Sequence, residues 1–349
     1  MDIRLALSNL LDKLQPGKFQ LDKYRLDNFQ LKGFQLDAAG LVALADLQSI
    51  ARWTAITGTS SFMDMLFLAP GIHKQSSAPS LSGGELPPTG ALTSGYVFRV
   101  ENEATVHFLQ SVGKTGNLIN LVVDSPPATA METLRCLVGS PGKIPLFLYA
   151  IGQTLTVAVI IILILFEDWW ALAILAMWIS ARFCNIWSIR RRSHIGWKGK
   201  AEPGANGDLL ILLTQDRWIR LRGTVDDLKA VTSGQWLRDK TLFDELLITF
   251  STLVVYLSAV LSANSSTVGS LCLLWLLLVS AGLLELCTGL SNGLQMYGRM
   301  LRVVGKPIPY ARRLDLAKEL IQETGRDDWA VGLGLILTSK DRGDGSVLL

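Results

Sequence analysis

Residues 144–189 read IPLFLYAIGQTLTVAVIIILILF, then Glu167 and Asp168, then WWALAILAMWISARFCNIWSI. Both apolar runs are long enough to cross the hydrocarbon of a bilayer, about 30 Å, because a helix rises about 1.5 Å per residue. Residues 246–263 and 267–290 repeat the arrangement around a short polar connection at 264–266. The sequence therefore predicts a membrane all-α bundle of four transmembrane helices, with runs 144–166, 169–189, 246–263 and 267–290 forming two hairpins.

The basic residues that flank these runs all lie on the same side of the predicted membrane. They are Arg135, Lys143, Arg190, Arg191, Arg192, Lys198, Lys200, Arg238, Lys240, Arg299, Arg302 and Lys306. Because positive charge resists translocation, we expect both termini and the middle loop to be cytosolic and the two tight turns to be translocated. Asn264 begins a glycosylation acceptor pattern on the translocated side, but its closeness to the membrane predicts poor modification.

Composition gives no indication of a metal, a cofactor or a nucleic acid. The formal net charge of +3 is too small to favour nucleic acid. The four cysteines, Cys136, Cys184, Cys272 and Cys287, form no C-x-x-C pattern, and the three histidines, His73, His107 and His194, lie in unrelated segments. Neither set has the spacing of a metal site, and a cytosolic location disfavours disulfides. We predict no cofactor and no metal.

The first 143 residues divide into two predicted regions. Residues 1–39 begin with an amphipathic surface helix and continue with the five-residue repeats FQLDK, YRLDN, FQLKG and FQLD, which we interpret as a packing arm. Residues 40–143 are predicted to be a cytosolic α+β region. Within it we expect a helical stretch over 40–70, a flexible loop over 75–95 because of its Ser, Pro and Gly content, and strands at 96–101, 105–112 and 118–123.

Two further cytosolic segments follow the predicted hairpins. The loop 190–245 contains candidate strands at 208–214 and 218–222 and a helix over 225–235, for which Thr224 provides the N-cap. The tail 291–349, which follows the second hairpin at 246–290, contains a predicted helix over 310–324 and a strand over 331–338. None of these fragments can form a core alone. We therefore expect the cytosolic parts to form one composite cytosolic α+β domain beneath the bundle.

Arg182 and Glu285 are the candidate site residues, because ionisable groups inside a span are costly and usually face a partner or a water-filled cavity. Both lie one to two turns from the cytosolic ends of their helices, so their depths allow a salt bridge. The favoured interpretation is structural: the two residues form an ion pair that fixes the bundle, or their side chains simply extend to the membrane interface. A substrate or proton site at these two residues is the alternative, and no catalytic residue is assigned.

Residues 216–238 read DRWIRLRGTVDDLKAVTSGQWLR, and this segment resembles one in uncharacterised multi-pass membrane proteins of filamentous fungi. The resemblance extends loosely over the membrane region. Some proteins of that kind are encoded beside enzymes of secondary metabolism, so the resemblance permits a role in such a pathway. It implies no catalytic residues.

Three functions remain open on these grounds. The first is a non-catalytic anchor or scaffold, whose partners would be the lipid bilayer, a cytosolic protein and a second copy of the chain. The second is a membrane-bound enzyme or accessory factor acting on a lipophilic intermediate, with Arg182, Glu285 and the tryptophans Trp169, Trp170, Trp178 and Trp187 near its site. The third is a small transporter or channel subunit, which four spans would form only as an oligomer.

Overall fold

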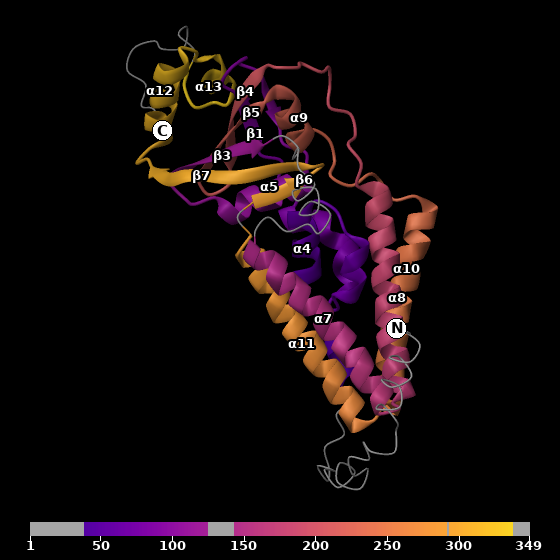
Figure 1. The fold of residues 1–349 in the computed structure, drawn as a ribbon. Coiled ribbons are helices and arrows are strands. Elements are labelled where there is room, and N and C mark those ends of the chain that lie inside the picture. The colour runs from indigo at the N-terminus through magenta and orange to yellow at the C-terminus, as the bar shows by residue number, and fades with distance from the viewer. Residues whose placement is uncertain (1–37, 125–142, 292, 338–349) are drawn as a thin grey trace, which may run out of the picture. The chain divides into compact units, whose positions relative to one another are not determined.

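The computed structural model describes residues 38–124, 143–291 and 293–337. The predicted amphipathic helix and five-residue repeats lie outside these residues. The described part contains four long helices and a mixed β-sheet covered by shorter helices (Figure 1). Both parts of the expected fold, a set of four candidate spans and a separate α+β region, are therefore present.

The four long helices are α7 (Lys143–Leu165), α8 (Trp169–Arg192), α10 (Leu242–Leu261) and α11 (Thr267–Gly289). Each is long and apolar enough to cross a membrane. Consecutive helices meet at their turns and then diverge, so that α7 packs along α11 and α8 packs along α10 (Figure 1). The two sequence hairpins therefore form two helix pairs whose members come from different hairpins.

The two turns meet at one end of the bundle, which we call the turn end. Asp168 caps α8 by accepting a hydrogen bond from Ala171 N at 3.0 Å, and it also accepts one from Ser266 N at 3.0 Å in the other turn. Ser266 in turn caps α11. A Cβ on Gly269 would collide with the Asp168 carboxylate, so this close approach requires glycine.

The sheet lies at the opposite end of the long helices, which we call the sheet end. Its strand order is β2-β1-β4-β5-β3-β7-β6. Among these described strands β3 and β5 pair in parallel and the other neighbours pair antiparallel. The strands are β1 (Pro88–Ala91), β2 (Val97–Arg99), β3 (Asn117–Asp124), β4 (Asn206–Leu213), β5 (Arg217–Thr224), β6 (Gly293–Met296) and β7 (Arg299–Pro309). Because they come from three segments separated by the candidate spans, the predicted composite α+β region is confirmed.

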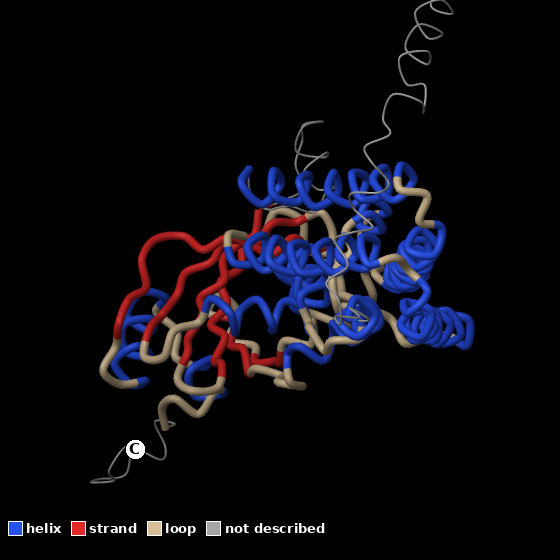
Figure 2. The backbone as a smooth tube through the Cα atoms, turned by 90° about the horizontal axis from the view of Figure 1, so that it is seen from below, coloured by secondary structure: helices blue, strands red, loops and turns tan. Residues whose placement is uncertain are grey.

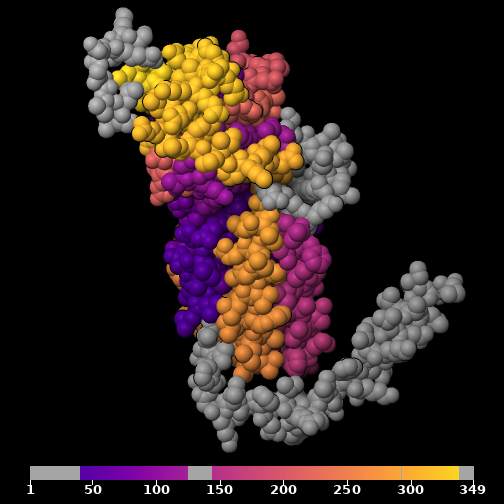
Figure 3. All heavy atoms as spheres, turned by 90° about the vertical axis from the view of Figure 1, so that its left-hand side faces the viewer, coloured from indigo at the N-terminus to yellow at the C-terminus, as the bar shows by residue number. Residues whose placement is uncertain are grey.

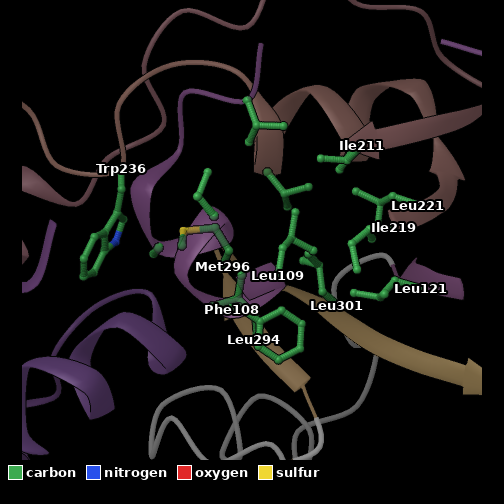
Figure 4. Close-up of a cluster of buried hydrophobic side chains, with 14 of the residues drawn as sticks. Phe108, Leu109, Leu121, Ile211, Ile219, Leu221, Trp236, Leu294, Met296 and Leu301 are labelled. Carbon is green, nitrogen blue, oxygen red and sulfur yellow. The ribbon is translucent and has the colours of Figure 1, made fainter. Parts of the chain in front are cut away.

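Short helices cover both faces of the sheet. On one face, α5 (Glu103–Val112), α9 (Val225–Thr232) and part of α4 (Ser49–Thr57) bury an apolar core that includes Phe108, Leu121 and Trp236 (Figure 4). On the other face, α12 (Arg313–Thr324) and α13 (Asp328–Gly332) pack on Leu118, Leu210 and other residues of a smaller core. The sheet is thus the middle layer of three.

Residues 38–82 fill the space between the two helix pairs, and we call them the wedge segment. It contains α3 (Ala38–Ala43), α4, the 3₁₀ helix η1 (Phe62–Leu66) and the 3₁₀ helix η2 (Ile72–Ser82). Parts of it contact α7, α8, α10 and α11. In Figure 3 the beginning of this segment, in indigo, lies directly beside α11 in orange.

The prediction of a flexible loop over 75–95 was wrong. Residues 72–82 form η2, residues 88–91 form β1, and the side chain of Gln75 is buried. Gln75 Nε2 donates to Thr54 Oγ1 at 3.2 Å and to Ser60 Oγ at 2.9 Å. A polar segment can be buried when its neighbours supply such bonds, which composition alone does not reveal.

Two predicted strands were also wrong. Residues 105–112 belong to α5, which begins where the Asn102 side chain accepts a hydrogen bond from Thr105 N at 3.0 Å. The cap outweighed the β-branched character of the segment. Residues 331–337 contain the end of α13 and turns, and residue 338 lies outside the described chain.

The remaining expectations differ from the structure mainly in their bounds. The helical stretch expected over 40–70 is divided among α3, α4 and η1, and the helix expected over 225–235 ends at Thr232. Thr224 caps that helix as expected, by accepting a hydrogen bond from Asp227 N. Gly325, with φ of 69°, ends α12.

Candidate functional site

The best-defined polar cluster inside the bundle is centred on Asp64 of the wedge segment. The local sequence Ser61-Phe-Met-Asp64 forms a capping box at the start of η1, in which Asp64 Oδ2 accepts a hydrogen bond from Ser61 N at 2.7 Å. The hydroxyl of Tyr149 on α7 donates to Asp64 Oδ1. Asp64 therefore joins its own segment to one of the long helices through a side chain that is almost completely buried.

Arg182 reaches the same cluster from α8. Its Nε donates to the main-chain oxygen of Asp64 at 3.2 Å, and its positive charge acts on the Asp64 carboxyl group. The Nη1 and Nη2 atoms of Arg182 are buried, and neither has a hydrogen-bond partner among the described residues. The cluster thus contains donor capacity that the surrounding side chains leave unused.

Aromatic rings enclose this cluster. The rings of Trp53 and Phe67, both in the wedge segment, stack on Tyr149 with centroid distances of 5.7 and 5.4 Å. A Cβ on Gly152 would overlap the Phe67 ring, so the ring lies directly on the backbone of α7. This low-polarity surrounding strengthens the electrostatic interaction between Asp64 and Arg182.

A second group of hydrogen bonds joins the wedge segment to the α8 and α10 pair. Asn185 Nδ2 donates to Ile72 O at 3.0 Å and to Ser251 Oγ at 2.7 Å. Nearer the turn end, Trp178 Nε1 donates to Ser258 Oγ at 2.8 Å. These polar residues of the candidate spans therefore connect packed elements.

The expected salt bridge between Arg182 and Glu285 was wrong. Glu285 lies on α11 and accepts a hydrogen bond from Ser49 Oγ at 2.7 Å, while its carboxylate pairs with Arg52 Nη1 at 3.3 Å. The wedge segment separates α8 from α11 at this depth and supplies both acidic and basic partners. No sequence pattern indicates that Asp64 or Arg52 would lie against the long helices, although the Ser61 to Asp64 spacing does match a capping box.

Trp178 is buried, whereas Trp169, Trp170 and Trp187 are exposed on the long helices, as aromatic residues at membrane interfaces are. Asn264 ends the 3₁₀ helix η3 (Ser262–Asn264) at the turn end and is exposed. Cys184, Cys272 and Cys287 are free thiols, while Cys136 is outside the described residues. Among the residues that the structure describes, no group of His, Cys, Asp and Glu could hold a metal ion.

A charged network on the sheet holds α12 in place. The guanidinium of the largely buried Arg220 donates to Asp208 at 2.7 Å and to Glu323 on α12 at 2.6 Å. Arg222 pairs with the same two carboxylates. The hydrogen bond from Arg220 holds the pKa of Glu323 below its ordinary value of 4.5.

This lowered pKa predicts a loss of stability in acid. Because the folded state holds Glu323 ionised, its contribution is complete above pH 4.5 and is lost as the pH falls through the lower folded-state pKa. The side chain is half exposed, so we expect only about 0.5–1 kcal/mol. The measurement is the difference in the free energy of unfolding between pH 6 and pH 3.5, obtained from thermal unfolding. The difference should shrink in Glu323→Gln, and an unchanged difference would contradict the assignment.

Comparison with known proteins identifies no relative of this chain. No protein-family model matches the sequence, and no curated protein and no solved structure matches it. The resemblance of residues 216–238 to fungal membrane proteins stays a prediction. Function has to be inferred from the arrangement of the wedge segment, the long helices and the sheet.

Proposed function

We propose that this chain is an integral membrane scaffold whose four long helices hold the sheet against the cytosolic face of a membrane, where it binds a cytosolic protein. One observation carries the proposal: the wedge segment is bonded to the long helices along its length and to the sheet at the sheet end. An anchor that fixes both the position and the orientation of a domain needs such a connection, because a flexible linker would fix neither.

The contacts at the sheet end are specific. Trp236 lies in the segment after α9, and its Nε1 donates a hydrogen bond to the main-chain oxygen of Gly58 at 2.6 Å. Gly58 directly follows α4. Gly58 has φ of 67°, and a Cβ there would collide with Gln295 O of β6. Arg190 Nη1, near the end of α8, donates to Ser60 O at 3.1 Å. Moving the sheet relative to the bundle would therefore break several buried contacts at once.

Charge supports a cytosolic location for the sheet. Arg190, Arg191 and Arg192 end α8 at the sheet end, while the turn end contains Glu167 and Asp168 and no basic residue in either connection. α12 and α13 lie at the sheet end with the sheet they cover. At Gly40, by contrast, an added Cβ would lie 2.7 Å from Ala259 Cα, near the end of α10. The described chain thus begins near the turn end. Charge therefore supports a cytosolic side for the sheet, α12 and α13, but not for the first described residues.

The second candidate function is that of an enzyme or accessory factor for a lipophilic intermediate. The observation that favours it is the pair of unpartnered Nη atoms on Arg182, because a carboxylate or phosphate group would complete their hydrogen bonding. Such a ligand would have to displace η1, since Arg182 is fully buried.

Quantitative proteomics of membrane fractions from a deletion strain and its parent tests the scaffold. We expect at least one otherwise soluble protein to leave the membrane fraction on deletion and to return with the wild-type gene. A matched variant, Trp197→Ala at an exposed site, should also restore it. An unchanged membrane proteome, together with accumulation of a precursor in untargeted mass spectrometry of metabolites, would overturn the scaffold and favour the second candidate.

A further inference from the structure

Strand β7 has an open edge along most of its length. It pairs with β6 only over residues 299–302, with Gly293 opposite Arg302, and it pairs with β3 on its other side as far as Pro309. Residues 303–309 therefore have no strand on one side within the described chain. An open edge of this length exposes backbone donors and acceptors and normally needs protection.

The side chains along this edge combine aliphatic and basic character. Val303, Val304 and Ile308 are 40, 50 and 40 % exposed. Residues 302–313 contain four basic residues, Arg302, Lys306, Arg312 and Arg313, and no acidic residue. Arg302 pairs with Asp124, and Arg313 pairs with Asp216. Within the described residues neither Lys306 nor Arg312 forms an ion pair, so the edge carries uncompensated positive charge.

The chain connectivity places the start of this edge, at Arg302, close to the end of α11. That helix ends at Gly289, and β6 begins at Gly293. Four extended residues and one strand spacing reach no more than about 19 Å, so Arg302 must lie within that distance of the helix end. Figure 1 shows β7 crossing above the ends of α7 and α11, and Figure 2 shows the strands extending to one side of the long helices.

We propose that residues 302–309 of β7 form a membrane-surface site that rests on the headgroup region beside α11 and prefers anionic phospholipids. This inference depends on the membrane insertion contained in the proposed function. Val304 and Ile308 on one face of the strand, and Val303 on the other, enter the boundary between headgroups and acyl chains along the edge. Lys306 and Arg312 meet lipid phosphates. Aliphatic and basic side chains together are the chemistry of interfacial attachment.

The strand geometry favours lipid over a further β-strand as the occupant. The register shifts between Leu118 and Asn120, opposite Gly305, whose φ is 79°. Pro307 and Pro309 lack the N–H groups that an added strand would need. A bulge and two prolines hinder strand addition from a second copy or a peptide, whereas lipid headgroups require no regular ladder.

Fluorescence in lipid nanodiscs tests the location. An environment-sensitive fluorophore is attached to Val304→Cys or Ile308→Cys in a chain whose four native cysteines are replaced. Lys318→Cys on an exposed part of α12 is the matched control. We expect lipids spin-labelled at the headgroup to quench the fluorophores at 304 and 308 severalfold more than at 318. Equal quenching, or shielding from aqueous iodide without lipid quenching, would overturn the proposal, and the latter would indicate a protein occupant.

Lipid selectivity provides a second measurement that keeps the native cysteines. Spin-labelled phosphatidylserine and phosphatidylcholine are compared for association with the reconstituted wild type, Lys306→Gln and Arg312→Gln. The preference for phosphatidylserine should fall about fivefold for each charge removed, which corresponds to about 1 kcal/mol. Lys318→Gln should leave it unchanged, and an unchanged preference in both test variants would contradict the anionic assignment.

An alkaline wash of native membranes separates the two levels of inference. Release of the chain by the wash would defeat the membrane insertion on which the scaffold depends. A chain that resists the wash, but shows neither quenching at 304 and 308 nor anionic preference, would defeat only the site on β7.

Discussion

Replacing Asp64 with alanine is expected to destabilise the protein by about 3–5 kcal/mol, because it leaves Arg182 buried without a nearby negative charge. It also removes the acceptor for Tyr149 and for the main-chain N–H of Ser61. The measurement is the fraction of monodisperse protein that remains in detergent after heating or after titration with a denaturing detergent. The cluster carries this effect because Asp64 and Arg182 are both almost completely buried.

A double-mutant cycle isolates the interaction. Asp64→Asn and Arg182→Met should each be strongly destabilising, while the double variant should cost less than their sum by about 1–3 kcal/mol. Glu285→Gln is the control: Glu285 and Arg52 are both nearly half exposed, so the change should cost at most about 1 kcal/mol. It should also be additive with Arg182→Met. Coupling between Arg182 and Glu285, or additivity between Arg182 and Asp64, would contradict an electrostatic interaction between the Asp64 carboxylate and Arg182.

Replacing Trp236 with alanine should cost about 3–5 kcal/mol as well, because it opens a large cavity in the core between the wedge segment and the sheet. Trp236 is fully buried, and its Nε1 donates to Gly58 O, which the variant would leave without that donor. Hydrogen exchange measured by mass spectrometry should show faster exchange after α4 and in β6, where Gln295 approaches Gly58.

Two control variants, Trp236→Phe and Trp197→Ala, separate the effect of this buried contact from the general effect of removing a tryptophan. Trp236→Phe keeps most of the buried apolar area but loses the hydrogen bond and part of the ring, so it should cost clearly less than the alanine variant. Trp197→Ala removes the same side chain from a site that is 83 % exposed, and its effect should lie within about 0.5 kcal/mol of zero. Equal losses for Trp236→Ala and Trp197→Ala would mean that the sheet and wedge segment are not joined through this contact.

Elements with strong local signals could be predicted from the sequence. The four long helices follow from the length of their apolar runs. Helix α9 begins directly after Thr224 because this hydroxyl and the acidic residue three positions later form an N-terminal cap. Strands β4 and β5 were also located, with bounds that differ by a few residues. In each case neighbouring residues in the sequence contain the determining interaction.

Elements whose conformation depends on distant contacts could not be predicted in this way. Residues 72–82 look like a flexible polar loop, yet buried hydrogen bonds of Gln75 to Thr54 and Ser60 stabilise them. Residues 105–112 have the composition of a strand but follow a strong helix cap at Asn102. The same limitation affected the candidate site. The depths of Arg182 and Glu285 in their helices allowed a salt bridge between them, but in the structure the wedge segment lies between the two residues.

The sequence by itself determined that the chain has four candidate spans, that its basic flanks lie on one side of them, and that the segments outside the spans must combine into one α+β unit. These conclusions rest on hydrophobic length, charge and core size, which are properties of segments. Only the tertiary structure decided that α7 packs along α11, that Asp64 rather than Glu285 lies beside Arg182, and that β7 presents an open edge beyond the ends of α7 and α11. Those facts depend on which distant segments fill the space between diverging helices, and that choice is made by packing and hydrogen bonding in three dimensions.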